Sequence, residues 1–325
     1  MAGIWVIGEP AADGALAHIS TEVSTLARSL AEAASADVTG VLVAAKPEQA
    51  ADELARYVPR VLAVTEPAAA DHAWATIAAE RVASLARQHR PDFILVGAGP
   101  DGRDVAGVLS LLLGWGVLVN ATGVAWTDDR PSVEMSVFGG KLITTSTFAG
   151  EHGIVTIRPN VVTAEPASAA GSVEAVKVDD DLQLPTVPVV DRVTEAGAAA
   201  PIEEARVIVA GGRGIGGPDG FKLVEEIADA LGGTVGATRA AVDSGWINYS
   251  QQIGQTGKIV KPRLYLALGI SGAIQHKVGM QTAETIVAVN RYPDAPIAEF
   301  ADLLVVGDLF EVGPAILSEL RARSG

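Results

Sequence analysis

The sequence predicts an α/β protein of two domains: an N-terminal Rossmann-like domain with an antiparallel extension, and a C-terminal Rossmann-like domain. Three observations favour this fold class. Apolar runs of strand length alternate with stretches of helical period, and the alternation starts again near residue 205. The chain has 325 residues, which suits two domains. Hydrophobic residues make up 49% and charged residues 19%, so both domains have material for a buried core.

The first part of the chain predicts a parallel sheet covered on both faces. Each apolar run is followed by a stretch of helical spacing, which is the pattern of repeated βαβ units. The expected strands are 3–8, 38–44, 60–64 and 93–97, and the expected helices are 15–34, 47–56, 72–89 and 104–113.

The stretch from Val105 to Thr127 carries no charged residue and is long enough to span a bilayer. Gly114, Gly116 and Asn120 interrupt it, and Asp101 and neighbouring polar residues open it as they open a helix. We therefore expect a buried helix followed by a buried strand, and no insertion into a membrane.

Beyond residue 117 the pattern changes to strands alone, at 117–126, 132–138, 141–148, 153–158 and 173–178. Glycine-rich and polar turns separate them, so we expect an antiparallel extension of the first domain. Residues 195–204 have neither strand pattern nor core face and predict a linker. The domains are then 1–194 and 205–325.

The second domain begins with a strand at 207–210 and a helix from Phe221 to Leu231, which Gly232 and Gly233 end. Further strands are expected at 234–238, 264–268, 285–289 and 303–306, and a last helix at 312–322.

Composition excludes several functions. A net charge of −15 argues against nucleic acid or an anionic membrane as a partner. The absence of cysteine excludes disulfides, thiolate metal sites and cysteine nucleophiles, and the five histidines lack metal-ligand spacing. No acid–base pair or nucleophile stands out, so we expect no substrate-converting enzyme. The N-terminus carries no export signal, which predicts a cytoplasmic protein.

Gly212, Gly214 and Gly217 form a GxGxxG motif between a strand and a helix, where glycine lets a backbone approach a pyrophosphate. A tight turn that needs glycine is the simpler structural reading. The next strand ends in Thr238 and Arg239, where a nicotinamide-binding unit would have an acid for the ribose. An arginine there fits either a 2′-phosphate or an electron-rich ring.

Two more polar, glycine-bearing segments lie where strands or their loops end: Ile253-Gly254-Gln255-Thr256 and Ser271-Gly272-Ala273-Ile274-Gln275-His276. Ligands bind at this edge of open α/β sheets. Taken singly, Thr256, Gln275 and His276 are more often structural than functional. Together with the two earlier turns, they are difficult to explain as turns alone.

These segments resemble the α-subunit of electron transfer flavoprotein. The resemblance covers nearly all of 205–320 and is most specific at Gly269–His276; residues 1–194 fit more loosely. It implies that the C-terminal domain holds FAD and that a β-subunit completes the flavin pocket in a heterodimer. It further implies that flavoprotein dehydrogenases donate electrons and a quinone-linked oxidoreductase accepts them.

The resemblance also implies a set of cofactor-binding residues. Arg239, Thr256 and His276 would lie nearest the isoalloxazine, with His276 donating toward the C2 carbonyl oxygen, where negative charge collects on reduction. Ser271 and nearby N–H groups would meet the pyrophosphate. The full set is Arg213, Thr238, Arg239, Ile253, Gly254, Gln255, Thr256, Ser271, Gly272, Ala273, Ile274, Gln275, His276, Asn290, Asp308 and Leu309.

Two other functions stay open on the residues alone. One is an NADP-linked oxidoreductase that uses the glycine turn, with Arg239 as phosphate ligand. The other is a nucleotide-binding scaffold without redox chemistry, which would purify colourless even with its partner.

Overall fold

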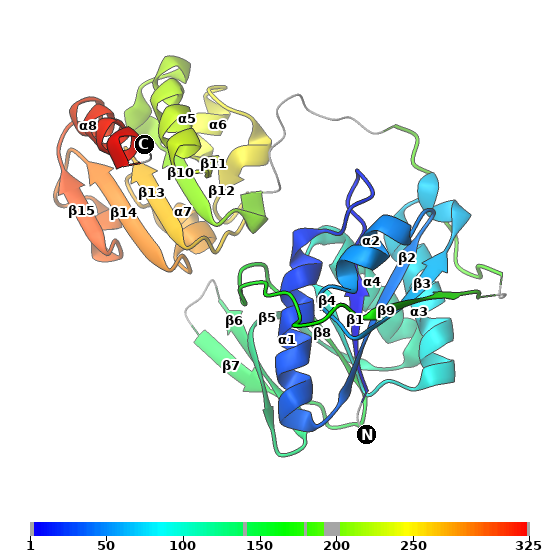
Figure 1. Ribbon diagram of the computed structural model, residues 1–325. Coiled ribbons are helices and arrows are strands. Elements are labelled where there is room, and N and C mark those ends of the chain that lie inside the picture. Colours follow the sequence, from blue (N-terminus) through cyan, green and yellow to red (C-terminus); the bar gives the residue numbers. More distant parts are fainter. Residues whose placement is uncertain (1–2, 139–141, 179–180, 192–201, 324–325) are drawn as a thin grey trace. The chain divides into compact units, whose positions relative to one another are not determined.

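The computed structural model describes residues 3–138, 142–178, 181–191 and 202–323 (Figure 1). The chain divides into two compact units, Met1–Val193 and Thr194–Gly325. Each unit has its own sheet and its own buried core, in agreement with the predicted α/β class. Most of the predicted linker, 195–204, lies outside the described residues; its end forms the 3-10 turn Ile202–Glu204.

The described strands of the first unit form a sheet in the order β7-β6-β5-β8-β4-β1-β2-β3-β9. The first four strands along the chain, β1 to β4, alternate with helices as predicted. The elements are β1 (Gly3–Gly8), α1 (His18–Ala34), β2 (Asp37–Ala44), α2 (Glu48–Leu54), β3 (Arg60–Thr65), α3 (Trp74–His89), β4 (Phe93–Gly97) and α4 (Pro100–Leu113).

Helices cover both faces of this sheet (Figure 1). Successive side chains of a strand point to opposite faces, and in β1 both sets are buried. Val6 packs in the layer that contains α1 and α2, whereas Ile7 packs in the layer of α3 and α4. This burial on two sides explains why the strands are continuous apolar runs without polar alternation.

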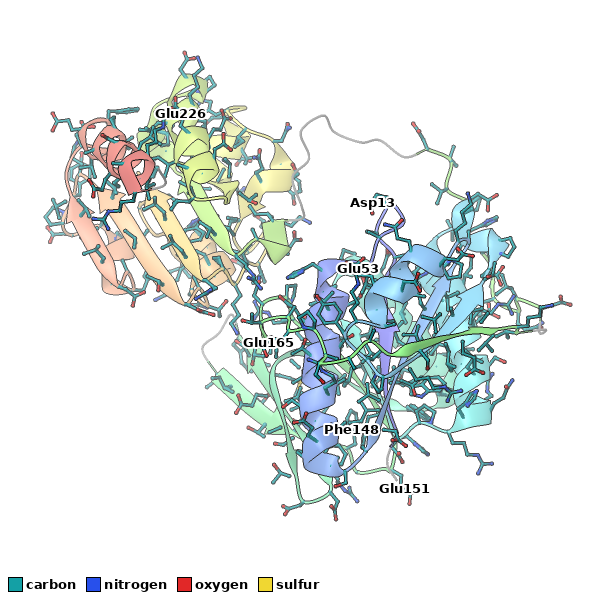
Figure 2. The ribbon with its side chains drawn as sticks, in the orientation of Figure 1. Asp13, Glu53, Phe148, Glu151, Glu165 and Glu226 are labelled. Atoms are coloured by element: carbon teal, nitrogen blue, oxygen red, sulfur yellow. The ribbon has the colours of Figure 1, made fainter. Side chains whose placement is uncertain are left out.

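Polar contacts fasten the segment between β1 and α1 to the rest of the unit. Glu53 of α2, labelled in Figure 2, accepts a hydrogen bond from the Leu16 backbone N–H at 3.0 Å. The Glu9 backbone N–H donates to the Ser20 hydroxyl at 2.9 Å. These contacts explain why α1 begins at His18, three residues later than predicted.

The predicted antiparallel extension is only partly right. β5 (Gly116–Thr127), β6 (Arg130–Val137) and β7 (Leu142–Ser146) do pair antiparallel. β8 (Gly153–Ile157) instead lies parallel between β4 and β5, and β9 (Ser172–Val176) lies parallel to β3 at the other edge. All five residues of β8 are buried, as an internal parallel strand requires.

The uncharged stretch from Val105 to Thr127 is divided between α4 and β5, as predicted. α4 starts at Pro100, four residues earlier than expected, because proline is well suited to the first helical position. No helix among the described residues is long and apolar enough to cross a membrane.

The second unit is a parallel sheet in the order β12-β11-β10-β13-β14-β15. Its elements are β10 (Val207–Gly211), α5 (Phe221–Ala230), β11 (Thr234–Thr238), α6 (Arg239–Asp243), β12 (Gln252–Ile253), β13 (Leu264–Leu268), α7 (Ile274–Met280), β14 (Thr285–Asn290), β15 (Leu303–Val306) and α8 (Leu309–Arg323). The strand order changes direction between β10 and β13. At such a switch point the loops diverge and leave a crevice for a ligand.

α5 and α8 cover one face of this sheet, and Glu226 of α5 (Figure 2) pairs with Arg321 of α8 at 3.1 Å. On the other face Tyr265 of β13 packs in one cluster with Met280 of α7. α8 starts three residues earlier than predicted because the Asp308 carboxylate accepts a hydrogen bond from Phe310 N–H at 2.9 Å.

Candidate functional site

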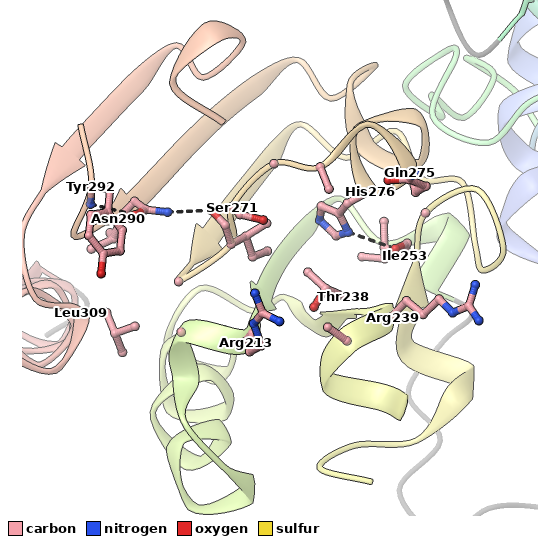
Figure 3. Close-up of a pocket in the computed structure, with 18 of the residues that line it drawn as sticks. Arg213, Thr238, Arg239, Ile253, Ser271, Gln275, His276, Asn290, Tyr292 and Leu309 are labelled. Atoms are coloured by element: carbon pink, nitrogen blue, oxygen red, sulfur yellow. Dashed lines mark hydrogen bonds between the residues drawn. The ribbon is translucent and has the colours of Figure 1, made fainter. Parts of the chain in front are cut away.

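A cavity of about 770 Å³ lies at the carboxyl ends of the second unit's strands (Figure 3). Residues at or just after the end of every strand in this sheet contribute to its wall. The volume lies within the range of small-molecule and cofactor sites. The cavity therefore occupies the place where the topology predicts a ligand.

The loop after β10 fits closely against the loop after β13. A Cβ added at Gly212 would lie 2.8 Å from Ile270 Cα, and one at Gly214 would lie 2.8 Å from Gly269 Cα. These two glycines are therefore required where the loops touch. Gly214 and Arg213 also line the cavity, so the approach of a pyrophosphate to this turn stays a prediction.

The segment after β13 is held by its neighbours. Asn290 is 7% exposed, donates through Nδ2 to the Ile270 carbonyl at 2.8 Å and accepts from Tyr292 N–H at 2.9 Å. Ile297 N–H donates to the Ser271 carbonyl at 3.0 Å. Within the described chain, the N–H groups of Ser271, Gly272 and Ala273 have no hydrogen-bond acceptor. They remain available to a ligand.

Thr238 and Arg239 follow β11 and line the same cavity. The Thr238 hydroxyl oxygen is buried and has no hydrogen-bond partner among the described residues. A buried hydroxyl without a partner is costly, so this position calls for a polar group from a ligand. Arg239 is more exposed and pairs with Asp243 at 3.1 Å, one helical turn along α6.

The 253–256 loop is tied to the start of α7. Gln255 N–H donates to the Gln275 carbonyl at 2.7 Å, and the Gln252 side chain donates to the Thr256 hydroxyl at 3.2 Å. Gly254 has φ +141°, a backbone conformation that L side chains rarely adopt. Ile253, Gly254, Gln255 and Thr256 all line the cavity, as the resemblance implies.

His276 lines the cavity but is 6% exposed. Its Nδ1 lies 3.0 Å from the Ile253 carbonyl oxygen and its Nε2 lies 2.9 Å from the Tyr265 hydroxyl (Figure 3 shows the first of these bonds). Burial lowers the pKa of the imidazole from 6.5 to about 4, against the opposing effect of the Ile253 bond. Both nitrogens thus have partners within the protein, and the donation from His276 toward a cofactor stays a prediction.

Two residues of the predicted set do not line the cavity: Ile274 and Asp308. Ile274 is 70% exposed at the start of α7. The Asp308 carboxylate accepts from Phe310 N–H and pairs with Arg291 at 2.6 Å; these bonds lower its pKa. The other fourteen predicted residues all line the cavity.

Sequence reasoning missed several lining residues, among them Asp243, Arg291 and Tyr292. Arg291 and Tyr292 directly follow β14, so extending the strand-end rule to every strand would have found them. Asp243 lies on α6, a helix of five residues that periodicity does not reveal.

The cavity wall is basic in an acidic chain, since Arg213, Arg239 and Arg291 contribute to it. Arg239 and Arg291 are paired with carboxylates. Arg213 has no carboxylate partner within the described ranges. A free guanidinium, unused backbone N–H groups and a buried hydroxyl together suit a ligand with phosphate groups and a polar ring.

Comparison with protein families agrees with this geometry. Residues 4–182 match the model of the electron transfer flavoprotein domain, and residues 201–281 match that of the electron transfer flavoprotein FAD-binding domain. The chain belongs to the electron transfer flavoprotein family. The match to that family's FAD-binding domain lies within the second unit, and the resemblance seen in the sequence is confirmed.

Among the chain's relatives are proteins named electron transfer flavoprotein subunit alpha. The Mycobacterium leprae protein is 42% identical over 313 residues, covering 96% of both chains. The Mycobacterium tuberculosis (strain H37Rv) protein is 42% identical over 325 residues, covering both chains completely. The Bacillus subtilis protein is 35% identical over 320 residues, covering 97% of this chain and 96% of the relative.

Proposed function

We propose that this chain is the FAD-carrying subunit of a cytoplasmic electron carrier. It takes electrons from flavoprotein dehydrogenases, such as acyl-CoA dehydrogenases, and passes them to a quinone-linked oxidoreductase. It converts no substrate of its own. The observation that best supports this proposal is the unpartnered Thr238 hydroxyl in the basic cavity of an FAD-binding domain.

The chain's residues divide the binding of FAD among them. Arg213 and the N–H groups of Ser271–Ala273 would hold the pyrophosphate, because they are donors of the cavity wall that no acceptor among the described residues uses. Thr238, Thr256 and Arg239 would lie toward the flavin ring, and Asn290 and Leu309 toward the adenosine. FAD supplies the group that is reduced and reoxidised; the protein positions it and shields it from water.

A second chain is needed to complete this site. His276 and Tyr292 are the aromatic side chains that line the cavity among the described residues. His276 is buried, and Tyr292 follows β14 beside Asn290, at the end proposed to hold the adenosine, so neither is placed to cover the flavin ring. We propose that a β-subunit covers the ring in an αβ heterodimer. We expect the isolated chain to lose FAD during gel filtration and the co-purified pair to keep it. Stoichiometric retention of FAD by the isolated chain would argue against this role for the partner.

Arg213 provides the direct test of FAD binding. Arg213→Gln removes a charged donor, and a hydrogen bond to a charged group is worth about 1.5–3 kcal/mol, so affinity is expected to fall roughly 10- to 150-fold. FAD titration of the heterodimer, followed by flavin fluorescence, measures this loss. Arg321→Gln is the matched control, because it makes the same charge change on α8 outside the cavity. Equal affinity in the two variants would contradict the role given to Arg213.

Arg239 separates the flavin carrier from an NADP enzyme. Its pair with Asp243 is exposed and therefore weak, so the guanidinium is free to move onto a flavin ring. Arg239→Ala is expected to keep most FAD binding and to lower the midpoint potential of bound FAD. Arg239→Lys should restore only part of that potential, because lysine keeps the charge but lacks the planar group. Titration with dithionite, and separately with NADP and NAD, checks this. An unchanged potential with a selective loss of NADP affinity would favour the NADP enzyme.

A further inference from the structure

Gln252 is a buried polar residue that the proposed function leaves without a role. It lies on the short strand β12, is 2% exposed and is not part of the cavity wall. Its side-chain amide donates through Nε2 to the Thr256 hydroxyl at 3.2 Å. Thr256 is itself exposed and lines the cavity. A buried amide therefore contacts a hydroxyl of the cavity wall from the interior of the protein.

The turn that follows β12 holds this pair together. Lys258 N–H donates to the Gln252 carbonyl at 2.7 Å, and the Tyr249 hydroxyl donates to the Thr256 carbonyl at 2.8 Å. A Cβ added at Gly257 would lie 2.9 Å from Gln252 Cγ and closer still to the Gln252 carbonyl oxygen. The turn therefore closes tightly over the Gln252 side chain and fixes Thr256 next to its amide.

The direction of the Gln252–Thr256 bond determines what Thr256 offers to the cavity. A hydroxyl has one proton and can both donate and accept, whereas an amide N–H only donates. Because Gln252 donates to the hydroxyl oxygen of Thr256, the proton of that hydroxyl is left for another acceptor. No acceptor for it lies within the described ranges of the chain. The proton is available to a ligand.

We infer that Gln252 is a positioning residue of the flavin site, whose amide makes the Thr256 hydroxyl a hydrogen-bond donor toward the bound cofactor. The inference rests on the proposed function, which places Thr256 toward the flavin ring. The ring presents nitrogen and oxygen acceptors, and its negative charge increases on reduction. A donor fixed against the ring therefore strengthens binding and favours the reduced cofactor.

The first test needs no FAD. Nitrogen-15 NMR of the glutamine-labelled chain is expected to show a Gln252 side-chain signal that moves in Thr256→Val, because valine has a similar shape and no hydroxyl. Thr256 is exposed, so we expect this variant to fold. Thr282→Val is the matched control, since the Thr282 hydroxyl donates to the Val260 carbonyl and not to Gln252. A Gln252 signal that stays in place in Thr256→Val would overturn the inference.

The second test compares Gln252→Met with Gln252→Glu in the heterodimer, by FAD titration and by the midpoint potential of bound FAD. Methionine removes the amide and leaves the Thr256 hydroxyl free to turn. We therefore expect FAD affinity to fall roughly 2- to 10-fold and the potential to become lower. A glutamate carboxylate only accepts, so it draws the Thr256 proton away from the cofactor and should cause the larger loss. A residue that served packing alone would give the opposite order, because glutamate keeps the shape of glutamine and a bond to Thr256.

The same changes in a Thr256→Val background show whether Gln252 acts through Thr256. There we expect Gln252→Met to have no further effect, and the loss that remains with glutamate measures its charge alone. Gln251→Met is the control, because it makes the same change at the preceding residue, also outside the cavity wall. Equal losses in both backgrounds, or a milder loss with glutamate than with methionine, would overturn the inference. A wild-type heterodimer that bound no FAD would count against the proposed function and leave the NMR result standing.

Discussion

Replacing Gly272 with alanine is expected to destabilise the FAD-binding unit and to remove most of its affinity for FAD. Gly272 has φ +83°, and a Cβ there would lie 2.6 Å from Ile297 Cα and still closer to its backbone nitrogen. A left-handed backbone costs an L residue about 1–2 kcal/mol, and overpacking costs about 1–3 kcal/mol, so the expected loss is about 2–5 kcal/mol. Since the collision is with backbone, the 271–273 segment must shift, and with it the N–H groups proposed to hold the pyrophosphate.

Gly216→Ala is a closely matched control. Gly216 has φ +82°, almost the same conformation, but no atom lies within 4 Å of a Cβ built on it. Replacing Gly216 with alanine should lower the free energy of unfolding only by the cost of the left-handed backbone, about 1–2 kcal/mol, and should leave FAD binding unchanged. Urea unfolding and FAD titration of both variants give the comparison. If the two proteins lose equal stability and equal affinity, the contact between Gly272 and Ile297 is not the constraint inferred here.

The strands were the most predictable part of the fold. The ends of β10 and β13 fall within one residue of the predicted 207–210 and 264–268, because strands buried on both faces are uninterrupted apolar runs. Their pairing was less predictable. An apolar run does not specify its neighbour, so β8 and β9 were assigned to an antiparallel extension although both pair parallel. α6 and β12, of five and two residues, are too short to show a period.

The sequence predicted which segments form the site, but not which residues hold those segments in place. Fourteen of the residues that the resemblance implied lie on the cavity wall. Their partners depend on distant parts of the chain. Asn290 is fastened to the Ile270 carbonyl, and His276 is enclosed by Tyr265 and Ile253. The resemblance implies that His276 donates toward the cofactor, but it could not indicate that Tyr265 and Ile253 lie against its two ring nitrogens.

The buried His276 should make the stability of the FAD-binding unit depend on pH. Its pKa is about 4 in the folded protein against 6.5 for an unperturbed imidazole, because burial disfavours the charged form. Between these values the unfolded chain binds more protons than the folded protein. The contribution of the neutral His276 to the free energy of unfolding is therefore fully present above about pH 6.5 and is lost as the pH falls toward 4. The difference of about 2.5 pKa units corresponds to about 3 kcal/mol.

His276→Gln isolates this contribution, because glutamine keeps an amide donor for Ile253 and does not titrate. The free energy of unfolding of the unit is measured by hydrogen exchange in peptides that cover β13 and α7, at pH 7 and near pH 4. Carboxylates affect both proteins alike, so the difference between wild type and variant reports on His276 alone. We expect the wild-type protein to lose about 3 kcal/mol more than the variant over this range.

His89→Gln, at an exposed histidine of the first unit, should behave as the wild type does. A constant difference across the range would mean that His276 takes up its proton in the folded protein as readily as in the unfolded chain, and that the Tyr265–His276–Ile253 arrangement does not hold it neutral.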